Sequence, residues 1–139
     1  MSLKTWKKKF YPVPAETKMT KLGAVEHSIQ KWTGLLPSNL EKHEVCAGDG
    51  GVCDYDNDEN LEINQSTCAL CYKYYDELGE LDDNDYSRCL KCPLYKTLGF
   101  ECGNGEDWAP FTAWMQHDDP KPMIKALKAT LKKVKAGEV

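Results

Sequence analysis

Residues 68–92 read CALCYKYYDELGELDDNDYSRCLKC and contain two Cys-x-x-Cys pairs with seventeen residues between them. The four cysteines are Cys68, Cys71, Cys89 and Cys92. Both thiolates of such a pair point the same way, so two pairs supply four sulfurs at tetrahedral positions around one ion. The spacing is typical of a structural zinc site, because four protein ligands leave no open coordination position. Zinc binding by such sites is coupled to folding, so the ion would decide whether the middle of the chain folds.

Two other fates of the same cysteines stay open. Two disulfides would form in an oxidising compartment, and an iron–sulfur cluster also takes four thiolates. Pro93 after Cys92 is a feature of some ferredoxin ligands, although the ferredoxin spacing is absent. The N-terminal sequence lacks the apolar stretch of a secretory signal, and no run of about 18 apolar residues occurs. We therefore expect a cytoplasmic protein and favour zinc as its structural cofactor.

Three further cysteines and one histidine are candidates for a second metal or thiol group. Cys46 and Cys53 flank a glycine-rich stretch and could approach each other, and His43 precedes Cys46 by one helical turn. Cys102 could complete this group, or it could lie beside the first site, since it follows Cys92 by ten residues. Buried thiols, or a disulfide between Cys46 and Cys53, are the alternatives.

Charge is segregated along the 139 residues, whose formal net charge is −4. Residues 1–45 have a balance of +4, residues 46–120 of −13 and residues 121–139 of +5. The ends can neutralise the middle within the fold. Alternatively, the acidic middle faces a basic partner, or the Lys-rich ends meet a nucleic acid. The candidate partner-binding carboxylates are Asp54, Asp56, Asp58, Asp82, Asp83 and Asp85.

Apolar periodicity predicts a mainly α fold with two clear amphipathic helices, over residues 21–33 and 121–136. Their apolar stripes are Leu22, Val25, Ile29 and Trp32, and Ile124, Leu127, Leu131 and Val134. Shorter helices are expected from a capping box at Ser38, over 67–78 and over 108–117.

The remaining segments are expected to be irregular. Residues 1–20 read as an extended basic arm, because prolines follow its aromatic residues, which would dock on the core or stack on nucleic-acid bases. Residues 47–65 and 80–87 read as acidic loops, and the chain from Cys92 to Asp107 reads as irregular. The predicted organisation is one domain with an extended basic arm (1–20), a helical part (21–46), an acidic zinc-binding part rich in cysteine (47–107) and C-terminal helices (108–139).

Catalytic constellations are scarce. The three histidines, His27, His43 and His117, are scattered, and no metalloprotease, nucleophile-elbow or phosphate-loop motif occurs. We therefore do not expect an enzyme.

A second set of short motifs carries a resemblance. These are His27-Ser-Ile-Gln-Lys-Trp-Thr-Gly-Leu, the first Cys-x-x-Cys pair, Cys89-Leu-Lys-Cys-Pro-Leu and the later Cys102. Together they resemble small uncharacterised bacteriophage-encoded proteins with paired Cys-x-x-Cys knuckles, the second followed by Pro-Leu. The resemblance spans about residues 27–131 and implies a phage origin, a location in the host cytoplasm and an accessory role without an assigned activity. Cys46, Cys53 and the long acidic loops depart from that pattern.

These observations lead to one functional expectation and two alternatives. We expect a non-enzymatic, zinc-stabilised binding protein, a phage accessory or inhibitor that docks on a host macromolecule through its acidic middle. The first alternative is a zinc-knuckle protein that binds nucleic acid through its Lys-rich termini. The second is an iron–sulfur or redox protein. No membrane or small-molecule partner is expected.

Overall fold

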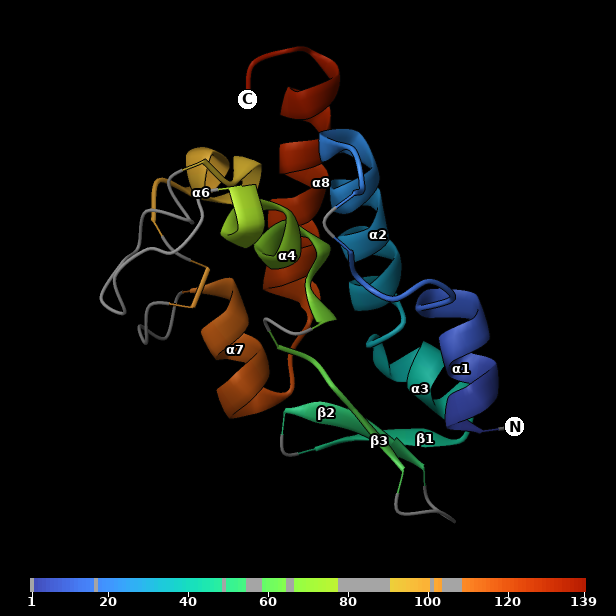
Figure 1. Cartoon of the computed structure of the whole chain (residues 1–139). Helices are drawn as coiled ribbons and strands as arrows, with labels where there is room; N and C mark the ends of the chain where they lie inside the picture. The colour runs from blue at the N-terminus through green and yellow to red at the C-terminus, as the bar shows by residue number, and fades with distance from the viewer. Residues whose placement is uncertain are drawn as a thin grey trace.

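The fold is described from a computed structural model of the chain (Figure 1). It describes residues 2–16, 18–48, 50–54, 59–64, 67–77, 91–100, 102–103 and 109–139, with the backbone alone at 72 and 75–77. Helices dominate the described residues, and one small sheet accompanies them, so the mainly α prediction holds. None of the described helices is long and apolar enough to cross a membrane.

Two long helices lie side by side at the centre of the fold, α2 (Lys21–Thr33) and α8 (Lys121–Lys135) (Figure 1). Both agree with the predicted ranges. The hydroxyl of Thr20 accepts a hydrogen bond from the backbone N–H of Gly23 at 2.9 Å, which caps the start of α2. The predicted stripe of α8 also lies inward, with Leu127 only 1% exposed.

The buried face of α2 contains Val25 and Trp32 of the predicted stripe, but it is wider than that stripe. Leu22 is 37% exposed, whereas Lys31 is 1% exposed. The reason is that α2 contacts α8 on one side and α4 (Ala69–Glu77) on another, so a wider arc of the helix is covered than one stripe. The buried arc therefore extends beyond the predicted stripe to Ala24, Ser28 and Lys31.

The expectation of an extended arm over residues 1–20 is wrong, because Leu3–Phe10 form helix α1. Pro12 follows the helix and so does not interrupt it. Apolar residues spaced three and four apart share one helical face, and this face packs on the core. Its buried residues are Leu3, Trp6 and Phe10.

A three-stranded antiparallel sheet, in the order β1-β2-β3, occupies much of the stretch that was expected to be an acidic loop. The strands are β1 (Val45–Gly48), β2 (Gly51–Asp54) and β3 (Asn60–Glu62). Gly50 adopts a φ of 75° at the tight turn between β1 and β2, a conformation that favours glycine. Val52, which is 0% exposed, anchors the sheet in the core. The loop prediction missed these strands because each is short.

The described residues also form the shorter helices α3 (Pro37–Lys42), α6 (Pro93–Leu98) and α7 (Pro110–His117). The capping box at Ser38 is wrong, because α3 begins at Pro37 and Leu36 precedes it without a side-chain cap. The expected irregular stretch after Cys92 contains α6. A proline in its first turn and Gly99 at a φ of 80° after its end are the signals that mark it.

Candidate metal centre

The first Cys-x-x-Cys pair lies at the start of α4. Cys68 immediately precedes the first helical residue, and Cys71 lies in the first turn. The backbone N–H groups of Leu70 and Cys71 donate hydrogen bonds to the Cys68 sulfur. This placement uses the unpaired N–H groups that every helix start presents, and such groups stabilise a negative charge.

The two thiols of this pair have opposite acidities. The hydrogen bond from the Cys71 thiol, with help from the nearby Lys31 ammonium group, lowers the pKa of Cys68 to about 5 in spite of burial. The same hydrogen bond raises the pKa of Cys71 well above its ordinary value, and burial adds to the rise. These contacts therefore favour ionisation of Cys68 over ionisation of Cys71 in the metal-free pair.

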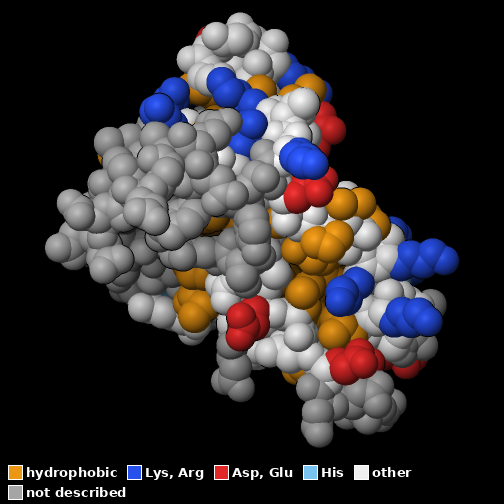
Figure 2. Space-filling model, viewed as in Figure 1, with side chains coloured by type: hydrophobic (Ala, Val, Ile, Leu, Met, Phe, Trp, Pro, Cys, Tyr) orange, Lys and Arg blue, Asp and Glu red, His pale blue; other side chains and the backbone are white. Residues whose placement is uncertain are grey.

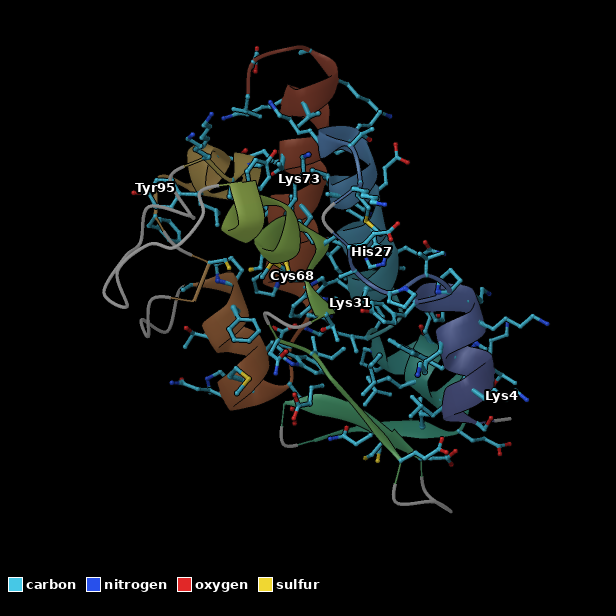
Figure 3. All side chains as sticks on the ribbon, in the orientation of Figure 1. Lys4, His27, Lys31, Cys68, Lys73 and Tyr95 are labelled. Atoms are coloured by element: carbon cyan, nitrogen blue, oxygen red, sulfur yellow. The ribbon has the colours of Figure 1, made fainter. Side chains whose placement is uncertain are left out.

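Lys31 is the functional residue that the sequence did not reveal. Lys31 and Cys68 are labelled next to each other in Figure 3. The Nζ of Lys31 donates a hydrogen bond of 2.9 Å to the carbonyl oxygen of Thr67, the residue just before Cys68. Burial lowers the pKa of Lys31, and the nearby cysteine thiolates partly restore it. Lysine inside an amphipathic helix is ordinarily read as solvent-facing, so only its contacts with α4 identify this role.

The hydroxyl of Thr67 fixes the position of the chain just before the Cys68–Cys71 pair. It donates a hydrogen bond of 2.8 Å to the carbonyl oxygen of Glu62, the last residue of β3. Thr67 thus joins the sheet to the start of α4, while its own carbonyl group accepts from Lys31. These two bonds set the position of Cys68 relative to α2.

Cys92 and Cys102 belong to the same neighbourhood. Cys92 immediately precedes α6, and the backbone N–H of Phe111 in α7 donates to the Cys102 carbonyl oxygen at 2.7 Å. A negative charge on either sulfur would raise the pKa of Cys71, and a charge on Cys102 would also raise the pKa of Lys31. The structure thus favours the alternative in which Cys102 lies beside the first site. Cys68, Cys71, Cys92 and Cys102 are called the thiol cluster below.

Cys89, the remaining predicted ligand, lies outside the described residues. Within the described ranges, no three His, Cys, Asp or Glu side chains are arranged to hold a metal ion.

The structure does not bring together the four residues of the candidate second site. Cys46 and Cys53 are directly opposite on β1 and β2. His43 turns instead toward α1, where its Nδ1 lies 3.2 Å from the Thr5 hydroxyl and its ring meets Phe10 edge to face. Cys102 is part of the thiol cluster.

One of the candidate partner-binding carboxylates has a place in the fold. An oxygen of Asp54 accepts a hydrogen bond of 3.2 Å from the backbone N–H of Leu3, at the start of α1. A carboxylate at a helix N-terminus satisfies a free N–H group there. The other five candidates, Asp56, Asp58, Asp82, Asp83 and Asp85, lie outside the described residues.

The basic residues and the aromatic residues of the N-terminal segment lie on different faces of α1, one exposed and one buried. Lys7, Lys8 and Lys9 are exposed, whereas the neighbouring Trp6 and Phe10 are buried. On the face in Figure 2, basic side chains gather around α1 and, separately, toward the end where α4, α6 and α8 lie. The aromatic side chains of α1 therefore dock on the core and do not offer a stacking surface for bases.

The scan of family models matched none to this chain, and the searches of curated proteins and of solved structures found no significant match.

Proposed function

We propose that the chain is a non-enzymatic binding protein stabilised by one structural Zn²⁺, which Cys68, Cys71, Cys89 and Cys92 bind. The observation that carries this proposal is the placement of Cys68 and Cys71 at the start of α4. Hydrogen bonds from the Cys71 thiol and from the backbone N–H groups there lower the pKa of Cys68, and the same thiol hydrogen bond, together with a charge on Cys92, raises the pKa of Cys71. Zinc binds thiolates, so a site that lowers the pKa of a cysteine lowers the cost of releasing its proton to the metal.

Lys31 supports the same proposal. A zinc ion with four thiolate ligands has a net negative charge, which is costly to bury without a compensating cation. The buried Lys31 ammonium group supplies that cation, and the carbonyl oxygen of Thr67 holds it in place at 2.9 Å. Groups outside the metal ligands that tune the charge of the site in this way are common in metal centres.

Metal content tests the zinc part of the proposal. We expect one zinc per chain in protein purified without added metal, and loss of that zinc in the C68S, C71S, C89S and C92S variants. The matched control is C46S, whose cysteine lies on the sheet and should leave the zinc content unchanged. Metal-free protein with few titratable thiols would contradict the proposal in favour of disulfides.

The binding part of the proposal rests on the balance of −13 over residues 46–120. This acidic middle docks on a basic surface of a host macromolecule, in keeping with the resemblance to phage accessory proteins. Binding to a basic DNA-binding protein should weaken as salt rises, because salt screens exposed charges. Replacing Asp82, Asp83 and Asp85 with Asn should weaken it further at low salt. Affinity that is insensitive to both changes would contradict this part.

A redox protein is the second candidate, and one specific observation favours it. The thiolate–thiol pair at the start of a helix, with Cys68 acidic and Cys71 not, is the arrangement of a reactive Cys-x-x-Cys motif. In zinc-loaded protein both sulfurs would be ligands and resistant to oxidation. Rapid formation of a Cys68–Cys71 disulfide in freshly purified protein would favour this candidate over zinc. Absorbance near roughly 400 nm would point instead to an iron–sulfur cluster.

The exposed lysines of α1 support the alternative in which the termini bind nucleic acid. A gel shift at low salt, compared with a variant in which Lys7, Lys8 and Lys9 are replaced by Gln, tests this alternative. It predicts a shift that weakens with rising salt and with loss of the three charges.

A further inference from the structure

Cys46 and Cys53 form a cross-strand pair in the β1–β2 hairpin. The register places them directly opposite each other, between the pairs Val45↔Asp54 and Ala47↔Val52. Directly opposite residues of antiparallel strands have Cα atoms roughly 4.5–5.5 Å apart, which lies within the range that a disulfide spans.

The thiols also point toward each other's strand. The Cys46 thiol donates to the carbonyl oxygen of Cys53, and the Cys53 thiol donates to the carbonyl oxygen of Cys46, each at 3.5 Å. Both side chains are half-buried, so neither is sealed in the core. The two sulfurs therefore occupy the space between the strands and remain open to small reagents.

The hairpin is held in this register from two sides. A tight turn closes it, with Gly50 at a φ of 75°, and β3 pairs with the other edge of β2, from Gly51↔Glu62 to Cys53↔Asn60. A slip of one residue would move Val52, which is 0% exposed, out of the core. The backbone thus keeps the two sulfurs opposite each other before any reaction.

From this geometry we propose that Cys46 and Cys53 are a reversible oxidation site, in which a small disulfide such as oxidised glutathione converts them to a cross-strand disulfide. One thiolate attacks the glutathione disulfide, which forms a mixed disulfide and releases one glutathione thiolate. The second thiolate attacks the protein sulfur of that bond, closes the Cys46–Cys53 bond and releases the second glutathione. Two electrons pass to glutathione, and the two thiol protons leave with its thiols or to solvent.

The Cys46–Cys53 disulfide would restrain β2, the strand whose Asp54 contacts the start of α1. Asp54, next to Cys53, accepts the hydrogen bond from the Leu3 N–H at the start of α1. A disulfide between the neighbouring positions therefore restrains the strand end on which α1 rests, without involving the thiol cluster. The site is independent of the zinc proposal.

The experiment titrates the full-length protein with mixtures of reduced and oxidised glutathione, followed by alkylation and peptide mass spectrometry. In the peptides that contain Cys46 and Cys53, we expect loss of two titratable thiols, a mass decrease equal to two hydrogen atoms and one cross-link, Cys46–Cys53, whatever the state of the thiol cluster. An excess of reduced glutathione should restore both thiols. In C46S and C53S, the remaining cysteine should instead retain one glutathione.

A register-shifted variant, C46S/A47C, is the matched control, because it keeps the number of cysteines but moves one thiol to the opposite face of β1. It should form glutathione adducts without the internal cross-link. Two glutathione adducts and no cross-link in the native sequence would overturn the proposal. An equally efficient cross-link in the register-shifted variant would overturn it as well, because the disulfide would then form whether or not the two cysteines are directly opposite each other.

Discussion

Lys31 and Cys68 are the residues whose chemistry depends most on their surroundings. A buried ammonium group is costly by itself, and burial lowers the pKa of Lys31 accordingly. A thiolate beside it offsets part of that cost, and the ammonium group in turn helps to lower the pKa of Cys68 to about 5. The two charges therefore stabilise each other within the fold.

The first prediction at this scale concerns K31M in metal-free protein. The pKa of Cys68 should rise from about 5, because the buried cation is gone, but stay below the ordinary thiol value while the Cys71 hydrogen bond remains. The rate of Cys68 alkylation as a function of pH, read by peptide mass spectrometry, measures it. Lys128→Met, on the exposed face of α8, should change nothing. An unchanged profile in K31M would show that Lys31 does not act on Cys68.

Gly34 provides a second test, of close packing. A Cβ atom at this position would lie 2.5 Å from Cγ of Phe10, too close for any ordinary contact. Gly34→Ala should lower the free energy of unfolding by about 1–3 kcal/mol, as overpacking does. Gly48→Ala is the control, since a Cβ there meets nothing within 4 Å. Urea unfolding of both variants measures the difference, and equal stabilities would refute the packing of α1 against the end of α2.

His43 gives a pH-dependent prediction. Burial, helped by the charges of Lys9, Lys42 and the N-terminal amino group, lowers the pKa of His43 below its ordinary value of 6.5. The unfolded chain therefore takes up this proton first, so its contribution to stability is intact above pH 6.5 and is lost as the pH falls below it. H43Q should lose less stability than the wild type between neutral and mildly acidic pH. His117→Gln, at an exposed position, should behave as the wild type does.

Among the elements, α1 is the one whose role changes most between sequence and structure. Trp6 is 0% exposed, and its Nε1 donates a hydrogen bond of 2.8 Å to the carbonyl oxygen of Gly34. The helix therefore contributes an anchor to the core and leaves its lysines outside. The same helix rests on the sheet through Asp54, so it joins α2 to β2.

Removing that anchor should be costly. Trp6→Ala should lower the free energy of unfolding by about 3–5 kcal/mol, because it deletes a large buried side chain and leaves a buried carbonyl oxygen without its donor. Lys8→Ala, exposed on the same helix, should stay within about 0.5 kcal/mol of the wild type. Chemical denaturation followed by circular dichroism compares them. A loss below about 1 kcal/mol in Trp6→Ala would mean that the segment behaves as a free arm.

At the scale of the whole molecule, the thiol cluster is where helices far apart in the sequence converge. Lys31 comes from α2, Cys68 from the start of α4, Cys92 from the start of α6 and Cys102 from the segment that pairs with α7. Helices α2 and α7 are also in contact, since the rings of Trp32 and Trp114 pack edge to face with their centroids 5.6 Å apart. A metal at the cluster would therefore join most of the helical part.

Metal removal should accordingly destabilise the whole fold rather than one loop. With zinc bound at the proposed site, a chelator should lower the melting temperature and broaden the transition, because binding free energy is folding free energy in such sites. C46S should melt and respond to the chelator as the wild type does. Calorimetry with and without the chelator measures both effects, and a melting curve unaffected by removal of bound zinc would assign the metal no structural role.

The long helices and the grouping of four cysteines into two Cys-x-x-Cys units could both be read from the sequence. Those features are local: the stripe over 121–136 and the cap at Thr20 depend on residues a few positions apart, so periodicity and capping rules reach them. The short elements were harder, since α1, α6 and the three strands each offer few residues to a periodic pattern. Gly50 and Gly99 lie at the ends of such elements with positive φ, but a glycine does not distinguish the end of a strand from the end of a helix.

Tertiary structure alone decided which residues meet. The contact of buried Lys31 with Thr67, the placement of Cys102 beside Cys71 and the pairing of Asp54 with Leu3 join positions 36, 31 and 51 residues apart. No local rule fixes such contacts, because they depend on how helices and strands cover one another. A lysine is polar in any sequence pattern, and it becomes the buried partner of a thiolate only when α4 packs against α2.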